Sequence, residues 1–256
     1  MKVYFIGAGP GAADLITLRG AHLLERCPVV MYAGSLVPTD VLTHCSSSAK
    51  IIDSSCLNLD EQTEQYKNAA AHDLDIARLH SGDPSIYGAI QEQITRLKEL
   101  GITYEIVPGV SSFTAAAAAL ATPLTVPGGS QTIILTRASG RASSVPEKED
   151  IGSLAQHDAT MCIFLSGNHF DETLSKLREH CPEDTPVALV RRATWSDQQV
   201  HTSTLGALRN EIRSADWQLT TLLLVGKNLS GELTRESALY SATYSHRFRR
   251  AAKAPL

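Results

Sequence analysis

Short apolar runs alternate with longer amphipathic segments along most of the chain, and this alternation is the first guide to the fold. In the first half of the sequence, the β-rich runs lie at residues 3–7, 29–32, 50–53, 75–80 and 103–107. Segments with helical character lie between them, at 60–71 and 85–100, and Gly101 is the kind of residue that ends a helix. Strands that alternate with helices in this way predict an α/β fold with a mostly parallel sheet.

The alternation is interrupted once and then resumes. An alanine-rich helical stretch at 114–121 is stopped by the prolines and glycines of 122–129. Further strands are expected at 132–137, 160–165, 187–191, 199–203 and 221–225, with helices at 170–179 and 205–213. The 256 residues fit either one large α/β domain or two smaller ones. The interruption and the second α/β pattern after it favour two α/β domains, each a mostly parallel or mixed sheet flanked by helices. Their expected bounds are 1–113 and 114–230, with a C-terminal tail at 231–256.

Composition narrows the possible partners. A formal net charge of -4 gives the chain no general attraction for nucleic-acid phosphates or anionic lipid. The 5 cysteines include no CxxC pair and the 9 histidines no metal-ligand spacing, so neither a disulfide framework nor a metal site is predicted. No apolar run approaches the roughly 18 residues of a membrane span. We therefore expect a cytoplasmic protein with no nucleic-acid, membrane or metal partner.

The most visible motif is GAGPG at residues 7–11, directly after an apolar strand and before a helical segment. Its glycines let backbone amides approach a ligand, and GAGPGA fits the permissive dinucleotide pattern G-x-G-x-x-A. The second strand, however, ends in YAGS at 32–35 and lacks the acid that would hold ribose hydroxyls, and Pro10 has no amide to offer a phosphate. Two interpretations of the motif therefore remain open: a tight turn without a ligand, and the nucleotide loop of an NAD- or FAD-binding oxidoreductase.

Two further polar loops follow predicted strands and precede helices, HSGDP at 80–84 and VPGVSS at 107–112. Open α/β sheets bind their ligands at the carboxyl ends of the strands, where these loops lie. Asp83 has two interpretations: it caps the following helix, or it accepts hydrogen bonds from the amino group or hydroxyls of a polar cofactor. Two such loops on neighbouring strands predict a pocket at this edge.

Four motifs in order then give the chain a family resemblance. They are VYFIGAGPGAADLITLRG at 3–20, VVMYAGSLV at 29–37, HSGDPSIYGAIQEQ at 80–93 and EIVPGVSSFTAAAA at 105–118. Together they resemble the SAM-dependent tetrapyrrole methyltransferases, the family of the uroporphyrinogen and precorrin methylases. Within it, YAGSLV, the IYGAI.EQ form and TIILTRASGR at 132–141 are most similar to the precorrin-4 C11-methyltransferases.

The resemblance implies two α/β domains with the active-site cleft between them, S-adenosyl-L-methionine as cofactor, and a homodimer. The positions that it implies for cofactor binding are Pro10, Ser81, Gly82, Asp83, Ile86, Ser111, Ser112, Ser166, Ala193 and Thr221. Those implied for the substrate are Gly9, Ser35, Arg137 and Arg141. The two arginines are chosen because a precorrin carries many carboxylates, which bidentate guanidinium groups bind well. No proton acceptor is assigned, so the catalytic residue is unknown.

The implied reaction is transfer of the SAM methyl group to C11 of precorrin-4, giving precorrin-5 and S-adenosyl-L-homocysteine in cobalamin biosynthesis. In this interpretation the glycine loop borders the active site and is not a phosphate cradle. Other hypotheses are a C17 or C20 precorrin methylase and an rRNA ribose methylase of the same fold. From other classes, an NAD- or FAD-binding oxidoreductase and a tetrapyrrole carrier without activity also remain.

Overall fold

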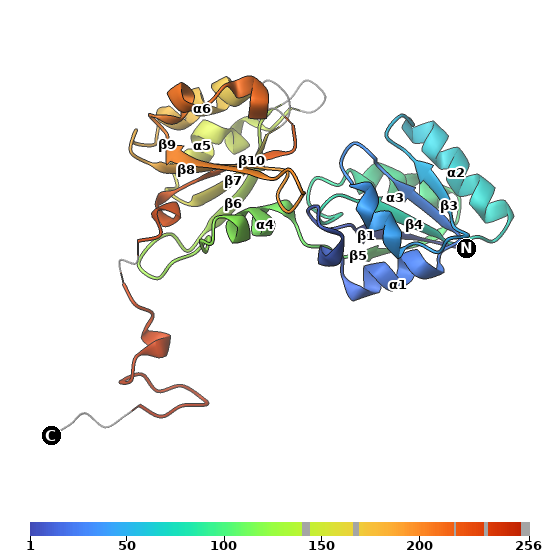
Figure 1. Cartoon of the computed structure of the whole chain (residues 1–256), viewed down its shortest axis with the longest axis horizontal. Coiled ribbons are helices and arrows are strands. Elements are labelled where there is room, and N and C mark those ends of the chain that lie inside the picture. Colours follow the sequence, from blue (N-terminus) through green and yellow to red (C-terminus); the bar gives the residue numbers. More distant parts are fainter. Residues whose placement is uncertain (140–143, 166–168, 218, 233–234, 252–256) are drawn as a thin grey trace. The chain divides into compact units, whose positions relative to one another are not determined.

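The computed structural model describes residues 1–139, 144–165, 169–217, 219–232 and 235–251. The chain folds into two compact units (Figure 1). Unit 1 comprises Met1–Ala116 and Arg192–Gln198, and unit 2 comprises Ala117–Arg191 and Gln199–Leu256. The boundary expected at 113 is close to this division, whereas the turn at Arg192–Gln198 groups with unit 1 and the residues beyond 230 group with unit 2.

Unit 1 contains a 5-stranded sheet with the order β3-β2-β4-β1-β5. All neighbouring strands are parallel, as the alternation of strands and helices predicts. The strands are β1 (Lys2–Gly7), β2 (Val29–Tyr32), β3 (Lys50–Asp53), β4 (Ile76–His80) and β5 (Thr103–Val107). The helices are α1 (Leu18–Arg26), α2 (Leu59–Ala71) and α3 (Ile90–Glu99), with short 3-10 helices η1 (Ala13–Leu15) and η2 (Thr39–His44). Helix α4 (Ser112–Ala119) spans the division between the two units.

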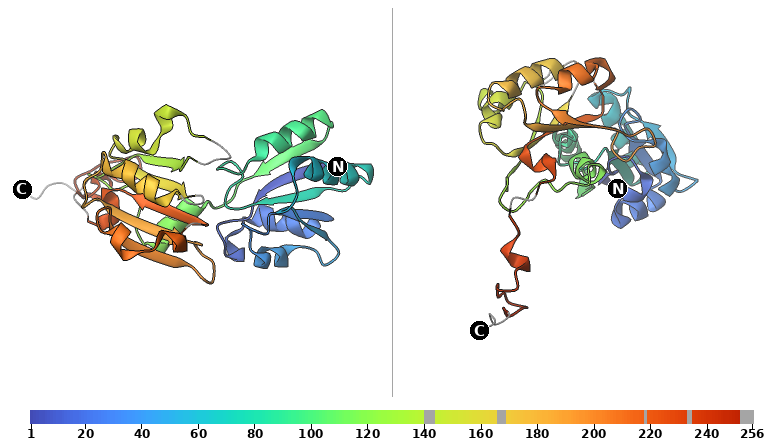
Figure 2. Two further views of the ribbon diagram at one scale, coloured as in Figure 1. Left: turned by 90° about the horizontal axis from the view of Figure 1, so that it is seen from above. Right: turned by 60° about the vertical axis from the view of Figure 1, so that its left-hand side comes forward.

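The sheet of unit 1 is covered on both faces, with α1 on one side and α2 and α3 on the other (Figures 1 and 2). Side chains of β1 alternate between the two faces. Tyr4 and Ile6 pack into the apolar cluster beneath α1, and Val3 and Phe5 pack into the cluster beneath α2 and α3. This two-sided burial explains why β1 is apolar from Val3 to Ile6.

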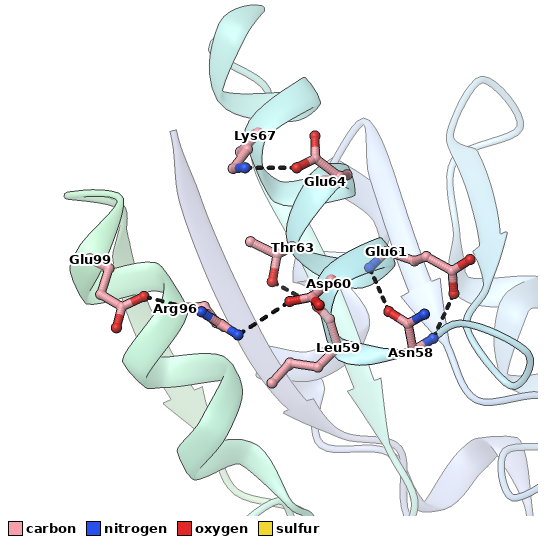
Figure 3. Close-up of polar contacts among 9 residues, drawn as sticks. All are labelled: Asn58, Leu59, Asp60, Glu61, Thr63, Glu64, Lys67, Arg96 and Glu99. Atoms are coloured by element: carbon pink, nitrogen blue, oxygen red, sulfur yellow. Dashed lines mark hydrogen bonds and ion pairs between the residues drawn. The ribbon is translucent and has the colours of Figure 1, made fainter.

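Local sequence also fixes the start of α2, where Asn58 and Glu61 form a capping box (Figure 3). The Asn58 side chain accepts from the Glu61 amide at 2.9 Å, and Glu61 Oε2 accepts from the Asn58 amide at 2.8 Å. The two exchanged bonds satisfy backbone donors that the first turn leaves open. Figure 3 also shows Arg96 of α3 bonded to Asp60 of α2 at 3.2 Å. This pair is exposed, so it contributes little to stability.

The helix predicted from residue 85 begins later, at Ile90. Tyr87 and Ala89 have φ values of 54° and 48°, in the left-handed region that a helix cannot contain. Residues 85–89 therefore form a loop at the carboxyl edge of the sheet.

Unit 2 contains a mixed 5-stranded sheet with the order β6-β7-β10-β8-β9. β6 and β7 are parallel, β10 is antiparallel to both of its neighbours, and β8 and β9 form a hairpin. The strands are β6 (Ile133–Arg137), β7 (Thr160–Leu165), β8 (Pro186–Arg191), β9 (Gln199–Thr204) and β10 (Thr221–Val225). The helices are α5 (Ile151–Ala155), α6 (Phe170–Arg178) and α7 (Leu208–Glu211), with 3-10 helices η3 (Glu147–Glu149), η4 (Ser214–Trp217), η5 (Lys227–Ser230) and η6 (Ala238–Tyr240). The helix predicted at 205–213 is thus only one turn long.

Apolar side chains of α5, α6 and α7 pack on one face of the unit 2 sheet, among them Ile151, Leu174 and Leu208. The parallel sheet of unit 1 and the mixed sheet of unit 2 are thus both flanked by helices. The predicted fold class, two α/β domains, is confirmed.

A buried asparagine organises the entry to the second sheet. Asn228 Nδ2 donates to the carbonyl oxygens of Leu124 and Ser130, each at 2.9 Å, and its Oδ1 accepts from the Ser130 amide at 3.1 Å. A Cβ on Gly129 would lie 2.4 Å from that Oδ1. Asn228 therefore holds the segment before β6 in place, and this fold leaves no room for a side chain at residue 129.

Within the described ranges, none of the helices combines the length and apolarity needed to cross a membrane. The same ranges contain no group of 3 or more His, Cys, Asp or Glu side chains able to hold a metal ion.

Candidate functional site

Three loops meet at the carboxyl edge of the first sheet because β4, β1 and β5 are adjacent. The loop after β1 is tied to the loop after β4 by backbone bonds. Ala8 N donates to His80 O at 2.8 Å, Gly9 N donates to Gly82 O at 3.3 Å, and Gly82 N donates to Gly9 O at 2.8 Å. The last two bonds form an isolated antiparallel bridge. The start of the glycine-rich loop is thus paired through its main chain with the loop after β4, and Gly9 turns the chain there with a φ of 80°.

Two glycines, Gly7 and Gly109, allow the backbones of these loops to touch. A Cβ on Gly7 would lie 2.5 Å from Gly109 Cα and 2.6 Å from Gly82 O. A Cβ on Gly109 would lie 2.2 Å from Gly82 O. All of these separations are too short for real atoms, so close main-chain packing alone requires glycine at residues 7 and 109.

Asp83 connects the second and third loops through its carboxylate. Its Oδ1 accepts from the Ser85 amide at 2.8 Å, and its Oδ2 accepts from the Gly109 amide at 2.9 Å. The bond to Ser85 resembles the predicted cap, although no helix begins there. The bond to Gly109 is one that the sequence did not predict. Asp83 therefore fixes the shape of the site from within.

The structure brings most of the predicted cofactor positions of unit 1 onto these loops. Pro10 follows β1, the group Ser81, Gly82, Asp83 and Ile86 follows β4, and Ser111 and Ser112 follow β5. Pro10, Gly82 and Ser111 are buried, and the others are half-buried. This edge presents hydroxyl and backbone groups, with few charges.

Ala193 belongs to a turn, Arg192–Gln198, that lies against the glycine-rich loop in unit 1. Trp195 Nε1 donates to Pro10 O at 3.0 Å, and Thr194 Oγ1 accepts from the Ala12 amide at 2.9 Å. Sequence reasoning missed both Thr194 and Trp195. No local signal could have found them, since the two bonds join residues 182 and 185 positions apart.

A cavity of about 510 Å³ opens beside the loop after β4. Ser35, predicted to contact the substrate, lines it together with Ser81, His80 and Arg78. Arg78 is only 5% exposed and donates to neutral oxygens of Ser54, Gln62 and Gln93 at 2.8, 3.1 and 3.2 Å. The other predicted substrate position of unit 1, Gly9, is buried in the loop pairing described above.

His80 is buried at this cavity and stays uncharged. Burial, and then the positive charge of Arg78, lower the pKa of His80 to about 3. Its Nε2 is buried without a hydrogen-bond partner among the described residues. A neutral imidazole is therefore one wall of the cavity, and it acts as a poor base at neutral pH.

The sequence shows no acid directly after β2, but a carboxylate from the neighbouring strand β3 lies beside that strand's end. Asp53 is the last residue of β3, and its Oδ1 accepts from the Gly34 amide at 3.0 Å and the Ser55 amide at 2.8 Å. These bonds hold the pKa of the exposed Asp53 carboxyl below its usual value. A Cβ on Gly34 would lie 2.4 Å from Asp53 Oδ2. The sequence placed Asp53 at a strand end, but the pairing of β2 with β3 was needed to bring it to Gly34.

The remaining predicted positions belong to unit 2 or lie outside the described residues. Thr221 begins β10, is buried, and donates from Oγ1 to Leu219 O at 3.2 Å. Arg137 ends β6 and donates to the carbonyl oxygens of Ala138 at 3.4 Å and Ser144 at 3.2 Å. Ser166 and Arg141 lie outside the described residues.

The sequence model of the tetrapyrrole (corrin/porphyrin) methylases matches residues 2–209 of this chain. The precorrin-4 C(11)-methyltransferase of Sinorhizobium sp is 45% identical to it, over 97% of this chain and 98% of that relative. The enzyme of the same name from Pseudomonas aeruginosa is 46% identical over 97% and 99%. The cobalt-precorrin-4 C(11)-methyltransferase of Methanocaldococcus jannaschii is 41% identical over 98% and 97%.

Solved structures agree with this match. The X-ray structure of a cobalt precorrin-4 methyltransferase aligns with a TM-score of 0.85 and 40% identity, over 89% of this chain and 95% of that one. A uroporphyrin-III C-methyltransferase from Thermus thermophilus, complexed with S-adenosylhomocysteine, shares the fold with a TM-score of 0.75 and 23% identity, over 91% and 100%. This chain therefore belongs to the tetrapyrrole (corrin/porphyrin) methylase family.

Proposed function

We propose that this chain transfers the methyl group of SAM to C11 of precorrin-4 in cobalamin biosynthesis, giving precorrin-5 and S-adenosyl-L-homocysteine. The observation that carries the proposal is the sequence identity of 45–46%, over 97% of the chain, to relatives named precorrin-4 C(11)-methyltransferase. Because the match spans nearly the full length of those relatives, it includes both units.

The loop edge of unit 1 suits a cofactor without phosphates. The amides of Ala8, Gly9, Ala12 and Gly82 donate to acceptors of the protein itself. Pro10 has no amide, so few donors of the glycine-rich loop are left for a pyrophosphate. SAM carries no phosphate and needs acceptors and donors for its hydroxyl and amino groups. This contrast argues against the NAD- or FAD-binding alternative.

The residues proposed to hold SAM are Pro10, Ser81, Gly82, Ile86, Ser111, Ser112, Ala193 and Thr221, with Ser166 outside the described residues. Asp83, also predicted to bind the cofactor, has both carboxylate oxygens engaged by backbone amides. We therefore propose that Asp83 acts on the cofactor mainly by shaping the loops.

The substrate positions that we propose are Gly9, Ser35, Arg137 and Arg141. Gly9 lies in the loop after β1, where its amide and carbonyl pair with Gly82, and Ser35 offers a hydroxyl at the cavity of about 510 Å³. A guanidinium at Arg137 or Arg141 would bind a carboxylate of the macrocycle rim in a bidentate manner.

SAM supplies the electrophilic methyl group when bound. The chain's own contribution is to align the nucleophilic carbon with that group and to keep water out of the site. We assign no proton acceptor. His80 is held neutral by burial, with its pKa lowered to about 3, and is too weak a base for this role. A homodimer that acts in the cytoplasm completes the proposal, and sedimentation analysis would test the dimer.

The direct test incubates the purified protein with precorrin-4 and SAM carrying an isotope-labelled methyl group. We expect one added methyl group in the product mass spectrum, and carbon NMR should place it at C11. A label at C17 or C20 would contradict the proposed position, and an unchanged substrate would contradict the activity. Incubation with NADH in place of SAM is the control and should leave the substrate unchanged.

A further inference from the structure

We propose that Trp195 and Thr194 are positioning residues that hold the glycine-rich loop in the form that receives SAM. The inference rests on the proposed function, in which Pro10 contacts the cofactor. It concerns side chains that belong to no motif of the sequence analysis.

The contact of Trp195 with the loop is both polar and steric. Its indole Nε1 donates to Pro10 O at 3.0 Å. A Cβ on Gly11 would lie 2.2 Å from Trp195 Cδ1 and 2.7 Å from Nε1, so the ring packs directly on the glycine Cα. Gly11 therefore has to be a glycine because of the tryptophan. This gives the last glycine of GAGPG a role that needs no direct ligand contact.

Thr194 attaches the turn to the loop a second time, at the residue after Gly11. Its Oγ1 accepts from the Ala12 amide at 2.9 Å. Thr194 has a φ of 69°, which is unfavourable for a β-branched residue. Arg192, two residues earlier, has a φ of 50°. Backbone conformations of this kind persist where surrounding contacts fix them, and they concentrate at functional sites.

The turn itself is braced so that the indole cannot swing away easily. Trp195 N donates to Arg192 O at 3.0 Å, and Gln198 N donates to Trp195 O at 3.1 Å. The Arg192 guanidinium lies 4.5 Å from the centre of the Trp195 ring, and it also pairs with Asp197. A cation over an indole face is attractive and helps to keep the ring in one orientation.

The two sides of the glycine-rich loop are thus held differently. Ala8 and Gly9 are bonded to the loop after β4, whereas Pro10 and Ala12 are bonded to the turn. Proline donates no hydrogen bond, and a glycine-rich segment has many accessible conformations. Without the turn, residues 10–12 would have to be ordered when the ligand binds, and this ordering reduces affinity.

The first experiment measures binding of S-adenosyl-L-homocysteine by calorimetry, so that no turnover is needed. Trp195→Phe keeps an aromatic ring on Gly11 but removes the hydrogen bond to Pro10. We expect its dissociation constant to rise about threefold to tenfold, the effect of one lost hydrogen bond. Trp195→Ala should bind more weakly still. Trp217→Phe is the matched control, because Trp217 is part of the apolar core of unit 2.

The second experiment uses fluorescence, since the chain has only 2 tryptophans. Emission from the Trp217→Phe protein comes from Trp195 alone and should change when S-adenosyl-L-homocysteine is added. Emission from the Trp195→Phe protein comes from Trp217 and should not change. A purely structural role for Trp195 would not produce this ligand-dependent difference.

The outcomes distinguish a wrong proposed function from a wrong role for Trp195. If the wild-type protein gives no heat with S-adenosyl-L-homocysteine, the proposed function is wrong. If it binds, but Trp195→Phe and Trp195→Ala bind equally tightly and Trp195 emission stays constant, the positioning role is refuted. Should Trp195→Ala fail to fold, Trp195→Phe and the emission of the Trp217→Phe protein still decide the question.

Discussion

Replacing Asp83 by asparagine tests how the candidate site keeps its shape. The carboxylate accepts two backbone bonds, from Ser85 at 2.8 Å and from Gly109 at 2.9 Å. Asn offers one oxygen and one NH₂ group, so in Asp83→Asn one of the two amides faces another donor. The variant thus loses a charge-assisted bond without a large change in volume.

The expected loss of stability follows from those two contacts. A hydrogen bond to a charged group contributes about 1.5–3 kcal/mol, and an unsatisfied buried amide costs a similar amount. Asp83 and Gly109 are both half-buried, so water compensates in part. We therefore expect Asp83→Asn to reduce the free energy of unfolding of unit 1 by about 2 kcal/mol.

Urea unfolding can follow each unit separately, because Trp195 lies in unit 1 and Trp217 in unit 2. The Trp217→Phe background reports on unit 1, and Asp83→Asn should lower the midpoint there. Asp60→Asn is the matched control, since it removes one exposed carboxylate that pairs with Arg96. It should change stability by less than about 1 kcal/mol.

The alternative is that Asp83 binds the cofactor directly. An unchanged unfolding midpoint together with a large loss of S-adenosyl-L-homocysteine affinity would refute the role in loop connection. Loss of stability with a smaller loss of affinity would support it.

Three further predictions concern other buried groups. The pKa of His80 is lowered from 6.5 to about 3. Between these two pH values the unfolded protein protonates this imidazole and the folded protein does not, so the free energy of unfolding should fall as pH falls from 6.5 toward 3. The expected slope is up to about 1.4 kcal/mol per pH unit. His80→Gln should flatten that part of the stability profile in urea unfolding, and an unchanged slope would contradict the cause. Burial raises the pKa of Cys27 to about 11 and of Cys162 to about 12, so a thiol reagent at pH 8 should modify the exposed Cys56 first and these two only after denaturation. Asn228→Ala leaves several buried backbone groups unpaired and should destabilise unit 2 by about 2–4 kcal/mol, measured by Trp217 emission in urea. A loss below about 1 kcal/mol would show that water replaces the amide.

Periodicity was sufficient for strands such as β1, because both of its faces are buried and residues 3–6 are all apolar. It failed where single residues adopt unusual backbone angles. Tyr87 and Ala89 sit in a sequence that favours a helix, yet their positive φ values delay α3 to Ile90. Such angles are imposed by the surrounding loops, and a local pattern does not contain that information.

The candidate site was likewise predicted only in part from the sequence. Motifs after β1, β4 and β5 predicted the loops around Pro10, Asp83 and Ser111, since parallel strands bring their carboxyl ends to one edge. The partners that shape those loops come from distant segments. Asp53 reaches Gly34 only through strand pairing, and Trp195 reaches Pro10 across 185 positions.

The contact among Gly7, Gly82 and Gly109 limits how such an enzyme can be redesigned. Because the contact joins main chain to main chain, no substitution of a neighbouring side chain can make space for an added methyl group at residue 7 or 109. Random libraries that vary these positions will therefore yield mostly misfolded clones. Under the proposed function, variation at Ser35, which lines the cavity, would alter the accepted macrocycle while the loop framework stays intact.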